Sequence, residues 1–395
     1  MKIIIPPTRF LKSMSLTNHN AEFGWESGID SAAYVLGDSQ SHRSLRPIFE
    51  LLDETEPPLI SAAAERAFAS LGVSSDNLPI DAVQSSASMI EKVKKCFDVS
   101  RRVLEDLKSV GYLDTFVECN RTLKRLSRAR IDITSLHAAI NSKEIKNISV
   151  AKGFFPKKDG FLEAPEYSIT RTLTGRTTII SGPQILTAPK LIRKYLKSSY
   201  QGGKIIQVDF ISLEPRVAMQ LTENDLGLDI YEHLASKLFD EKVSRSVVKK
   251  LVLCAVYGAS EATLKRGLPE GINISQIVEK TKEMLNYRQV VDEQAVNFEK
   301  TGKIRNFFGR PVEPQSARES LLYNNYIQST AVDVSLLGFG QILDRCKLRA
   351  KPIFFIHDAM LLDVHPDDIE EFKNISSSIV IDGLGEFPLD FQVLG

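Results

Sequence analysis

The spacing of apolar residues along the chain predicts a helix-rich middle and short strands that end in aspartates. Residues 86–145 carry apolar side chains near helical spacing, with lysines and arginines on the opposite face. Residues 205–210 (IIQVDF) are typical of a buried strand, and 352–364 (PIFFIHDAMLLDV) of a strand–turn–strand around a His-Asp pair. Further helices are predicted at 61–71, 229–238 and 243–257. Strands separated by long helical segments favour an α+β fold with a large helical insertion.

The composition is that of an ordinary globular protein, with 43% hydrophobic and 25% charged residues in a chain of 395. No apolar run reaches the ~20 residues that span a bilayer, and the first residues lead into prolines, so we expect neither a membrane segment nor a signal peptide. The four cysteines lie far apart with no CxxC pair. This spacing argues against a disulfide framework and a zinc site, and it indicates a reducing, cytoplasmic location.

The net charge is zero, but the charges are unevenly distributed. Residues 90–130 contain eleven Lys or Arg against six Asp or Glu, and residues 189–204 contain five basic residues and no acid. Residues 357–395 contain nine acids and one lysine. Basic stretches beside an acidic tail permit a DNA-binding face on a neutral protein, although solvated helix faces produce the same pattern.

Two aspartates, Asp209 and Asp358, stand at the ends of predicted strands. Carboxylates on strand ends suit Mg²⁺, a cation that takes oxygen ligands and keeps substrate phosphates as partners. Two such ions about 3.5–4 Å apart can activate a 3′-hydroxyl and stabilise the leaving oxygen of an in-line displacement. Taken alone, each aspartate is more typical of a turn residue, and a separation of 149 positions does not show that the two converge.

The helix predicted at 243–257 has a stripe of four residues spaced by four: Arg245, Lys249, Leu253 and Tyr257. Four residues turn a helix by about 400°, so these side chains lie along one line about 18 Å long. The two cations could neutralise phosphates at one end, and the aromatic ring could stack on a base at the other. The alternative is an amphipathic helix with two solvated cations and a buried tyrosine.

Five segments, in order, resemble motifs of family A (polymerase I-like) DNA polymerases. VDFISLEPRV (208–217) resembles motif A, RSVVKKLVLCAVYG (245–258) motif B, and FFIHDAMLLDV (354–364) motif C. RTLTGRTTIISGPQILTAPK resembles the T-x-T-G-R stretch before motif A, and GKIRNFFGRPVEP followed by NNYIQSTAVD resembles the segments between motifs B and C. The closing FPLDFQVLG is similar to the last palm strand. The resemblance covers residues 168–395 and identifies a compact, bacteriophage-type member of the family.

The resemblance implies a role for each matching position. Asp209 and Asp358 are implied to be catalytic and to hold two Mg²⁺ ions (or Mn²⁺), with the carbonyl of Phe210 as a further metal ligand. The implied nucleotide-binding residues are Glu214, which would exclude a ribose 2′-hydroxyl, and Arg245, Lys249, Leu253 and Tyr257. The implied DNA-binding residues are Arg176, Gln328 and His357. The implied partners are primer–template DNA, dNTPs and replication accessory proteins.

Some positions depart from the family pattern. Ala359 stands where the family has an acid after His-Asp, so a third carboxylate is lost or supplied elsewhere. Leu253 replaces a Phe or Tyr, so we expect this position to contribute less to sugar discrimination. Pro215 stands where Leu is frequent and is expected to bend the start of a helix. The short spacing from Asp209 to Arg245 predicts trimmed fingers.

The resemblance implies a right-hand α+β polymerase with an antiparallel-sheet palm, helical fingers and a helical thumb. The expected parts are an N-terminal region without an assigned role (1–85), the thumb (86–164), the palm (165–220 and 322–395) and the fingers (221–321). Residues 1–85 are too few for an exonuclease domain of roughly 100–200 residues and contain no acidic Asp-x-Glu strand. We therefore expect template-directed DNA synthesis by two-metal nucleotidyl transfer, without proofreading by this chain. The expected location is the cytoplasm, which is the host cytoplasm if the chain is of phage origin.

Two alternatives to a DNA polymerase stay open at this point. DIYEHLASKLF and the motif B segment also look like segments of single-subunit RNA polymerases or primase-like enzymes, and Leu253 fits those enzymes. Glu214, the Thr-Gly-Arg segment and the Gln328 segment favour a DNA polymerase instead. A catalytically inactive DNA-binding protein of this kind would lack the metal-binding aspartates, and both are present.

Overall fold

The structure, a computed structural model, describes residues 2–5, 15–19, 22–26, 34–35, 47, 50, 61–72, 86–145, 147–221, 226–239, 243–257, 273–346 and 349–394. The chain divides into two compact units, Met1–Val117 and Glu118–Gly395. Within these described ranges, none of the helices combines the length and the apolar character needed to cross a bilayer.

The N-terminal unit contains a four-stranded sheet in the order β3-β2-β1-β4, in which β4 runs parallel to β1 and the other neighbours are antiparallel. Its elements are β1 Lys2–Ile5, β2 Ser15–His19, β3 Glu22–Glu26, β4 Tyr34–Val35, α2 Ala62–Ser70 and α4 Ser86–Ser109. Ser61 caps α2 by accepting the amide of Ala64 at 3.2 Å, so the helix predicted at 61–71 is confirmed. Most of the prolines of residues 1–85 lie outside the described residues.

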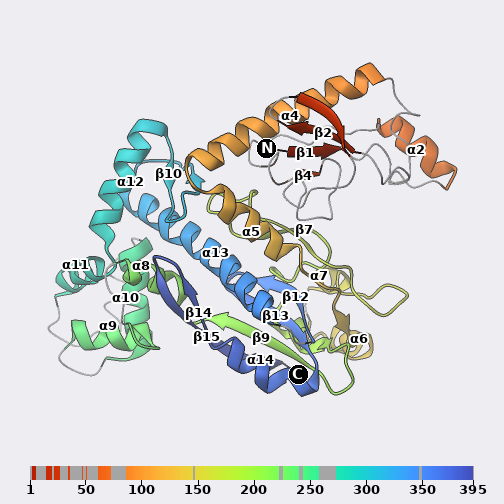
Figure 1. Ribbon diagram of the computed structural model, residues 1–395. Helices are drawn as coiled ribbons and strands as arrows, with labels where there is room; N and C mark the ends of the chain where they lie inside the picture. Colours follow the sequence, from red (N-terminus) through yellow and green to blue (C-terminus); the bar gives the residue numbers. More distant parts are fainter. Residues whose placement is uncertain are drawn as a thin grey trace. The chain divides into compact units, whose positions relative to one another are not determined.

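An antiparallel five-stranded sheet in the order β12-β13-β9-β15-β14 is the centre of the second unit (Figure 1). Its strands are β9 Lys204–Phe210, β12 Ala350–Ile356, β13 Ala359–Val364, β14 Ser378–Ile381 and β15 Gly385–Leu394. The strand predicted at 205–210 and the strand–turn–strand predicted at 352–364 are both confirmed. The prediction of an α+β fold is confirmed as well, since the chain combines this antiparallel sheet with many helices.

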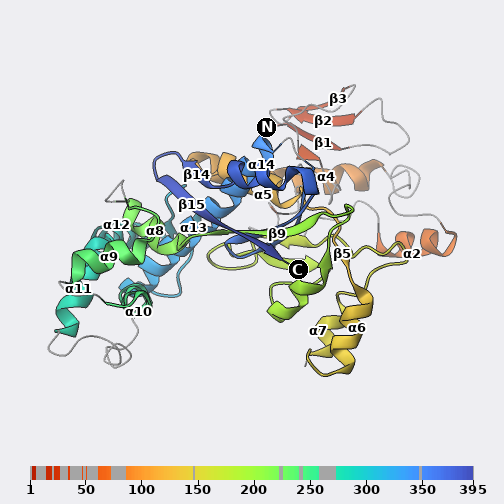
Figure 2. The same cartoon turned by 90° about the horizontal axis from the view of Figure 1, so that it is seen from below.

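The helices of the second unit form two groups: α8 to α12 lie at one end of the sheet, and α6 and α7 at the other (Figure 2). The helix α13 runs between them and contacts α8, α10, α12 and β14. The helices are α6 Ile133–Asn141, α7 Ile148–Lys152, α8 Leu213–Gln220, α9 Ile230–Leu238, α10 Arg245–Tyr257, α11 Ile274–Met284, α12 Tyr287–Thr301, α13 Glu319–Arg345 and α14 Ile369–Ile375, with short 3-10 turns at Lys190–Tyr195 (η2) and Pro366–Asp368 (η4). α5, Leu113–Leu123, crosses from one unit to the other.

Three short strand pairs complete the second unit. They join β5 Arg130–Ile131 to β8 Leu196–Lys197, β6 Glu166–Ser168 to β7 Thr178–Ser181, and β10 Ile304–Arg305 to β11 Pro311–Val312. The helical pattern predicted for 86–145 is interrupted at β5, where pairing with β8 outweighs local helical preference. Asp132 then caps α6 by accepting the amide of Ser135 at 3.1 Å.

The side chains of the central strand β9 alternate between its two faces, and each face packs against other elements. Phe210 packs against Phe339 of α13, with ring centroids 5.3 Å apart. On the opposite face, Ile205 belongs to an apolar cluster that includes Leu136 of α6 and Ile192 of η2. Asp209 is on the Ile205 face, beyond the buried Ile205 and the half-buried Gln207, so a packed strand positions its half-buried carboxylate.

Gly338 allows α13 to lie close to the sheet. A Cβ at this position would lie 2.1 Å from Cδ1 of Ile379 and 2.9 Å from the ring of Phe210. Glycine inside a helix costs about 0.5–1 kcal/mol relative to alanine, and here the close packing of helix on sheet offsets that cost.

Candidate active site

Asp358 is held at the tip of the hairpin formed by β12 and β13. The two-residue turn consists of His357 and Asp358, and His357 has the left-handed backbone (φ 57°) that tight hairpins use. The amide of Phe210 donates to the Asp358 carbonyl at 3.1 Å, which fastens the turn to the end of β9. The sheet thus brings Asp209 and Asp358 to the same edge, as a shared metal site requires.

Asp209 lies in a row of residues that crosses three strands. It pairs with Ala359 of β13 on one side and with Asp390 of β15 on the other. Burial raises the pKa of Asp209 to about 6, and the charges of Asp358 and Asp390 add to this effect, while a hydrogen bond from Gln207 (3.3 Å) opposes it. Burial also raises the pKa of Asp358. The site therefore concentrates negative charge that a divalent cation would neutralise.

The oxygen donors at this edge fit Mg²⁺ that is shared with a substrate. Asp209, Phe210 and Asp358 all line one cavity. Within the part of the chain that the structure describes, no group of three or more His, Cys, Asp or Glu side chains forms a metal cage made of protein alone. Mg²⁺ is commonly held by one or two carboxylates together with waters and substrate phosphates, so this donor set suits that ion.

The chain turns sharply after β9 and starts α8 beside the two aspartates. Ser212 adopts a left-handed backbone (φ 57°), and α8 begins at the next residue. Pro215 was expected to bend this start, but it lies in the first turn, where the helix uses no amide donor. Arg216 is buried and donates to the carbonyls of Gly227 and Leu228 at 2.9 and 2.8 Å, which fixes the segment leading into α9.

Glu214, in the first turn of α8, is held by two partners from other elements. Its Oε1 accepts from Nη2 of Arg176 at 3.1 Å, and its Oε2 accepts from the hydroxyl of Tyr257 at 2.5 Å. Burial raises the pKa of Tyr257, and the bond to Glu214 adds to this effect, so the phenol stays a donor at neutral pH. These contacts link three segments that are distant in sequence.

The four residues of the predicted stripe form the exposed face of α10 and line the same cavity as the aspartates. Most of the positions between them are buried, namely Val247, Val248, Leu251, Val252, Cys254, Ala255 and Val256, whereas Ser246 and Lys250 are exposed. The predicted stripe is therefore confirmed as a face, although Gly258, the last residue of the motif B segment, lies outside the described residues. Tyr257 is 36% exposed, which contradicts the alternative of a buried tyrosine.

Arg245, at the first end of the stripe, is engaged by residues of α9. Its Nε donates to Oδ2 of Asp229 at 2.7 Å, and its guanidinium lies 4.7 Å from the ring centroid of Tyr231. Asp229 also caps α9 through the amide of Tyr231 at 2.9 Å. The start of α9 therefore orients the cation at the cavity wall.

Arg176 and Gln328 meet at another wall of the cavity. With its amide oriented to match its neighbours, Gln328 accepts from Nη2 of Arg176 at 2.8 Å and donates to the hydroxyl of Thr174 at 2.5 Å. Arg176 therefore bridges Gln328 of α13 and Glu214 of α8.

The structure brings all the residues with an implied catalytic or binding role to one cavity of about 710 Å³. Its lining includes Arg176, Asp209, Phe210, Glu214, Arg245, Lys249, Leu253, Tyr257, Gln328, His357 and Asp358. This volume is in the range of pockets that hold small-molecule ligands (roughly 300–1,000 Å³).

The family model described as DNA polymerase family A matches residues 82–392. The chain belongs to this family. Over 276 residues it is 28% identical to a DNA polymerase of Bacillus phage SP01, a match that covers 58% of this chain and 30% of the phage protein. The fold is similar to the POL domain of Pol1 from M. smegmatis, solved in complex with DNA primer-template and dNTP. That match has a TM-score of 0.59 at 14% identity and covers 89% of this chain and 81% of that one.

The sequence motifs did not single out three further residues at the site: Asp390 and Tyr231, which line the cavity, and Asp229, which does not. Asp390 lies directly across from Asp209, on the side of β9 opposite the Ala359 position where the family has an acid. Tyr231 and Asp229 orient Arg245. The alternation of FPLDFQVLG shows that Asp390 is on a strand, but its pairing with β9 depends on a register that cannot be read from the segment itself.

Proposed function

We propose that this family A chain is a template-directed DNA polymerase that adds dNTPs to a primer 3′-hydroxyl. The observation that carries the proposal is the convergence of eleven motif residues, from five segments of the second unit, on one cavity. The fold is similar to a domain that was solved with DNA primer-template and dNTP, which supports the same class of substrates here.

We assign the carboxylates of Asp209 and Asp358 to two Mg²⁺ ions, with the Phe210 carbonyl as an added ligand. When bound, such ions lower the pKa of the attacking hydroxyl and neutralise charge on the reacting phosphate. The crowded negative charge at this edge supports the assignment, because the raised pKa of Asp209 shows how poorly the site tolerates that charge by itself.

The cations of α10 are assigned to the triphosphate. Arg245 and Lys249 are on the exposed face of the helix and line the cavity. A guanidinium forms paired hydrogen bonds with phosphate oxygens and an ammonium acts as a point charge, so together they would orient the nucleotide and stabilise charge as the leaving group departs. Leu253 and Tyr257 continue the stripe toward Glu214, where the sugar and base would lie.

The hydrogen-bonded set of Glu214, Tyr257 and Arg176 is assigned to sugar selection and to the primer–template. Glu214 is fixed from two sides, so its carboxylate can fill the space that a 2′-hydroxyl would need. Arg176 and Gln328, joined to one another, are assigned to the duplex minor groove, and His357 to the primer end.

The finer architecture is part of the same proposal. The five-stranded sheet would be the palm, residues 221–321 the fingers and residues 86–164 the thumb. Residues 1–85 keep no assigned role. In line with the phage SP01 relative, we also propose a bacteriophage setting and replication accessory proteins as partners. The absence of proofreading by this chain stays a prediction.

Primer extension on a DNA template tests the proposal. Purified protein with Mg²⁺ and dNTPs should extend a primer, with a product sequence complementary to the template. Extension with rNTPs in preference to dNTPs would support the RNA polymerase alternative, and no extension with either would support an inactive DNA-binding protein.

A further inference from the structure

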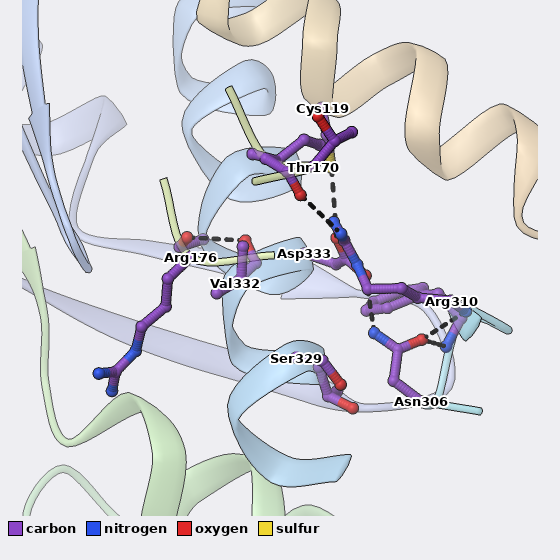
Figure 3. A network of polar contacts seen from close by, with 12 residues as sticks. Cys119, Thr170, Arg176, Asn306, Arg310, Ser329, Val332 and Asp333 are labelled. Carbon is purple, nitrogen blue, oxygen red and sulfur yellow. Dashed lines mark hydrogen bonds and ion pairs between the residues drawn. The ribbon is translucent and has the colours of Figure 1, made fainter. Parts of the chain in front are cut away.

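Arg310 is a buried cation that joins α13 to the loop between β6 and β7. Its side chain is 5% exposed and that of Asp333, its partner on α13, is 0% exposed. Nη2 of Arg310 donates to Oδ1 of Asp333 at 2.5 Å and Nε donates to Oδ2 at 3.1 Å, which is a paired, fork-like contact. Nη1 donates to the carbonyl of Ile169 at 3.2 Å, at the start of the loop. Figure 3 shows this network.

The same carboxylate is held by further groups. Nδ2 of Asn306 donates to Oδ2 of Asp333 at 2.7 Å, and Oδ1 of Asn306 accepts the amide of Arg310 at 2.9 Å. The thiol of Cys119 lies 3.8 Å from Oδ1 of Asp333. The pair is therefore fixed in one geometry by its surroundings.

The loop between β6 and β7 rests directly on the guanidinium. Gly175 has a left-handed backbone (φ +78°), and a Cβ there would lie 2.2 Å from Nη1 of Arg310. The turn is closed by the amide of Gly175 donating to the carbonyl of Thr172 at 3.1 Å, and by the Thr172 hydroxyl donating to the carbonyl of Arg176 at 2.8 Å. Only a glycine lets the backbone approach the cation this closely.

The loop delivers Arg176 to the cavity. Figure 3 shows the side chain of Arg176 extending away from Arg310, and it reaches Glu214 and Gln328 as described above. The loop is thus attached to α13 at two points, through Arg310 to Asp333 and through Thr174 and Arg176 to Gln328.

We propose that the buried pair of Arg310 and Asp333 positions Arg176 in the cavity, and so acts on nucleotide insertion without touching the substrate. The inference rests on the proposed function and assigns positioning residues to it. A buried ion pair adds little net stability over apolar residues of the same volume, whereas its fork geometry fixes two backbone segments relative to each other. A role in positioning accounts for a charged pair at this place better than stability does.

The test compares the Arg310→Lys variant with wild type in two measurements. Hydrogen–deuterium exchange of peptides that cover residues 169–176 reports how firmly the loop is held, and it does not require activity. Single-nucleotide insertion on a primer–template reports its effect on function. We expect faster exchange confined to the loop, and kcat/KM for dNTP insertion lowered about 10-fold.

The same substitution in an Arg176→Ala background separates positioning from general damage. If Arg310 acts through Arg176, Arg310→Lys should lower insertion by less than about 2-fold in that background, because coupled residues do not add. The proposal would be overturned if Arg310→Lys lowered kcat/KM by the same factor in the Arg176→Ala background as in wild type. It would also be overturned if amide exchange of the loop were unchanged in Arg310→Lys. Arg349→Lys is the matched control, since Arg349 also binds two aspartates, Asp367 and Asp368, but does not line the cavity.

A second variant keeps the test valid if Arg310→Lys does not fold. Replacing the pair with Arg310→Met and Asp333→Leu fills the same space without charge and should preserve cooperative unfolding in urea. We expect this double variant to be folded, with fast exchange in the loop and low insertion activity. Wild-type exchange and insertion in that variant would contradict a positioning role. If wild type itself inserts no nucleotide, the proposed function fails, and the exchange measurement still decides whether the pair fixes the loop.

Discussion

The hydroxyl of Tyr257 donates a hydrogen bond of 2.5 Å to Glu214, from α10 to the start of α8. Glu214 also accepts from Arg176 at 3.1 Å, so its carboxylate is held from both sides of the cavity. A carboxylate in a fixed position can exclude a larger sugar more effectively than one that moves freely. Sugar selection should therefore depend on Glu214 itself and on the partners that hold it.

Glu214→Ala should raise ribonucleotide incorporation by at least about 10-fold. Loss of the side chain opens the space that a 2′-hydroxyl needs, and discrimination worth a few kcal/mol corresponds to about 10²–10³-fold. Single-nucleotide insertion kinetics with dNTP and rNTP on both proteins measure the ratio. Tyr257→Phe keeps the ring and removes the hydrogen bond, so it should give a smaller change in the same direction. An unchanged dNTP/rNTP ratio in Glu214→Ala would show that another residue selects the sugar.

Arg245→Ala and Lys249→Ala should each raise the KM for dNTP by roughly 10-fold or more. Hydrogen bonds to charged groups contribute about 1.5–3 kcal/mol, and both side chains line the cavity where we place the triphosphate. Lys250→Ala is the matched control, because Lys250 is exposed on the same helix but does not line the cavity. Steady-state insertion kinetics decide the point, and equal effects at Lys249 and Lys250 would contradict the assignment.

Asp209→Asn should stabilise the metal-free protein at neutral pH. The pKa of Asp209 is raised from 3.8 to about 6 in the folded chain, so its ionisation destabilises the fold. Below pH 4 the carboxyl is protonated in both folded and unfolded chains and has no effect. The loss of unfolding free energy caused by this ionisation develops between about pH 4 and 6 and is complete above pH 6. With allowance for solvent screening, the gain in unfolding free energy at pH 7.5 should be roughly 1–2 kcal/mol.

Urea unfolding in the presence of a chelator, at pH 4 and at pH 7.5, measures this effect. Asp390→Asn removes one of the charges that raise the pKa of Asp209, so it should give a smaller gain with the same pH dependence. A destabilised Asp209→Asn protein at pH 7.5 would show that the carboxylate is compensated in the fold.

Local patterns in the sequence predicted much of the site. The run before Asp209, the hairpin around Asp358 and the four-residue spacing along α10 each depend on interactions within a few residues, and the structure has all three. Because motif order was recognisable, the convergence of these segments on one cavity could be anticipated from the family.

Features set by contacts between distant segments could not be predicted. The position of Asp390 opposite Asp209 depends on strand register, and a shift of one residue would turn it to the other face. The pairing of Arg310 with Asp333 depends on how α13 packs, and neither residue has a local pattern that indicates burial. The sheet order of the N-terminal unit likewise arises from pairing that short, weakly patterned strands do not reveal.

The central claim is that Asp209 and Asp358 hold the metals for nucleotidyl transfer, and single-turnover insertion of one dNTP tests it most directly. Asp209→Asn and Asp358→Asn should each lower the insertion rate at saturating Mg²⁺ by about 10³-fold or more, on the order of 4 kcal/mol. Primer–template affinity, measured by fluorescence anisotropy, should remain near that of wild type. Asp382→Asn, at an exposed aspartate outside the cavity, should insert at the wild-type rate. Insertion within about 10-fold of wild type by either active-site variant would contradict the two-metal assignment.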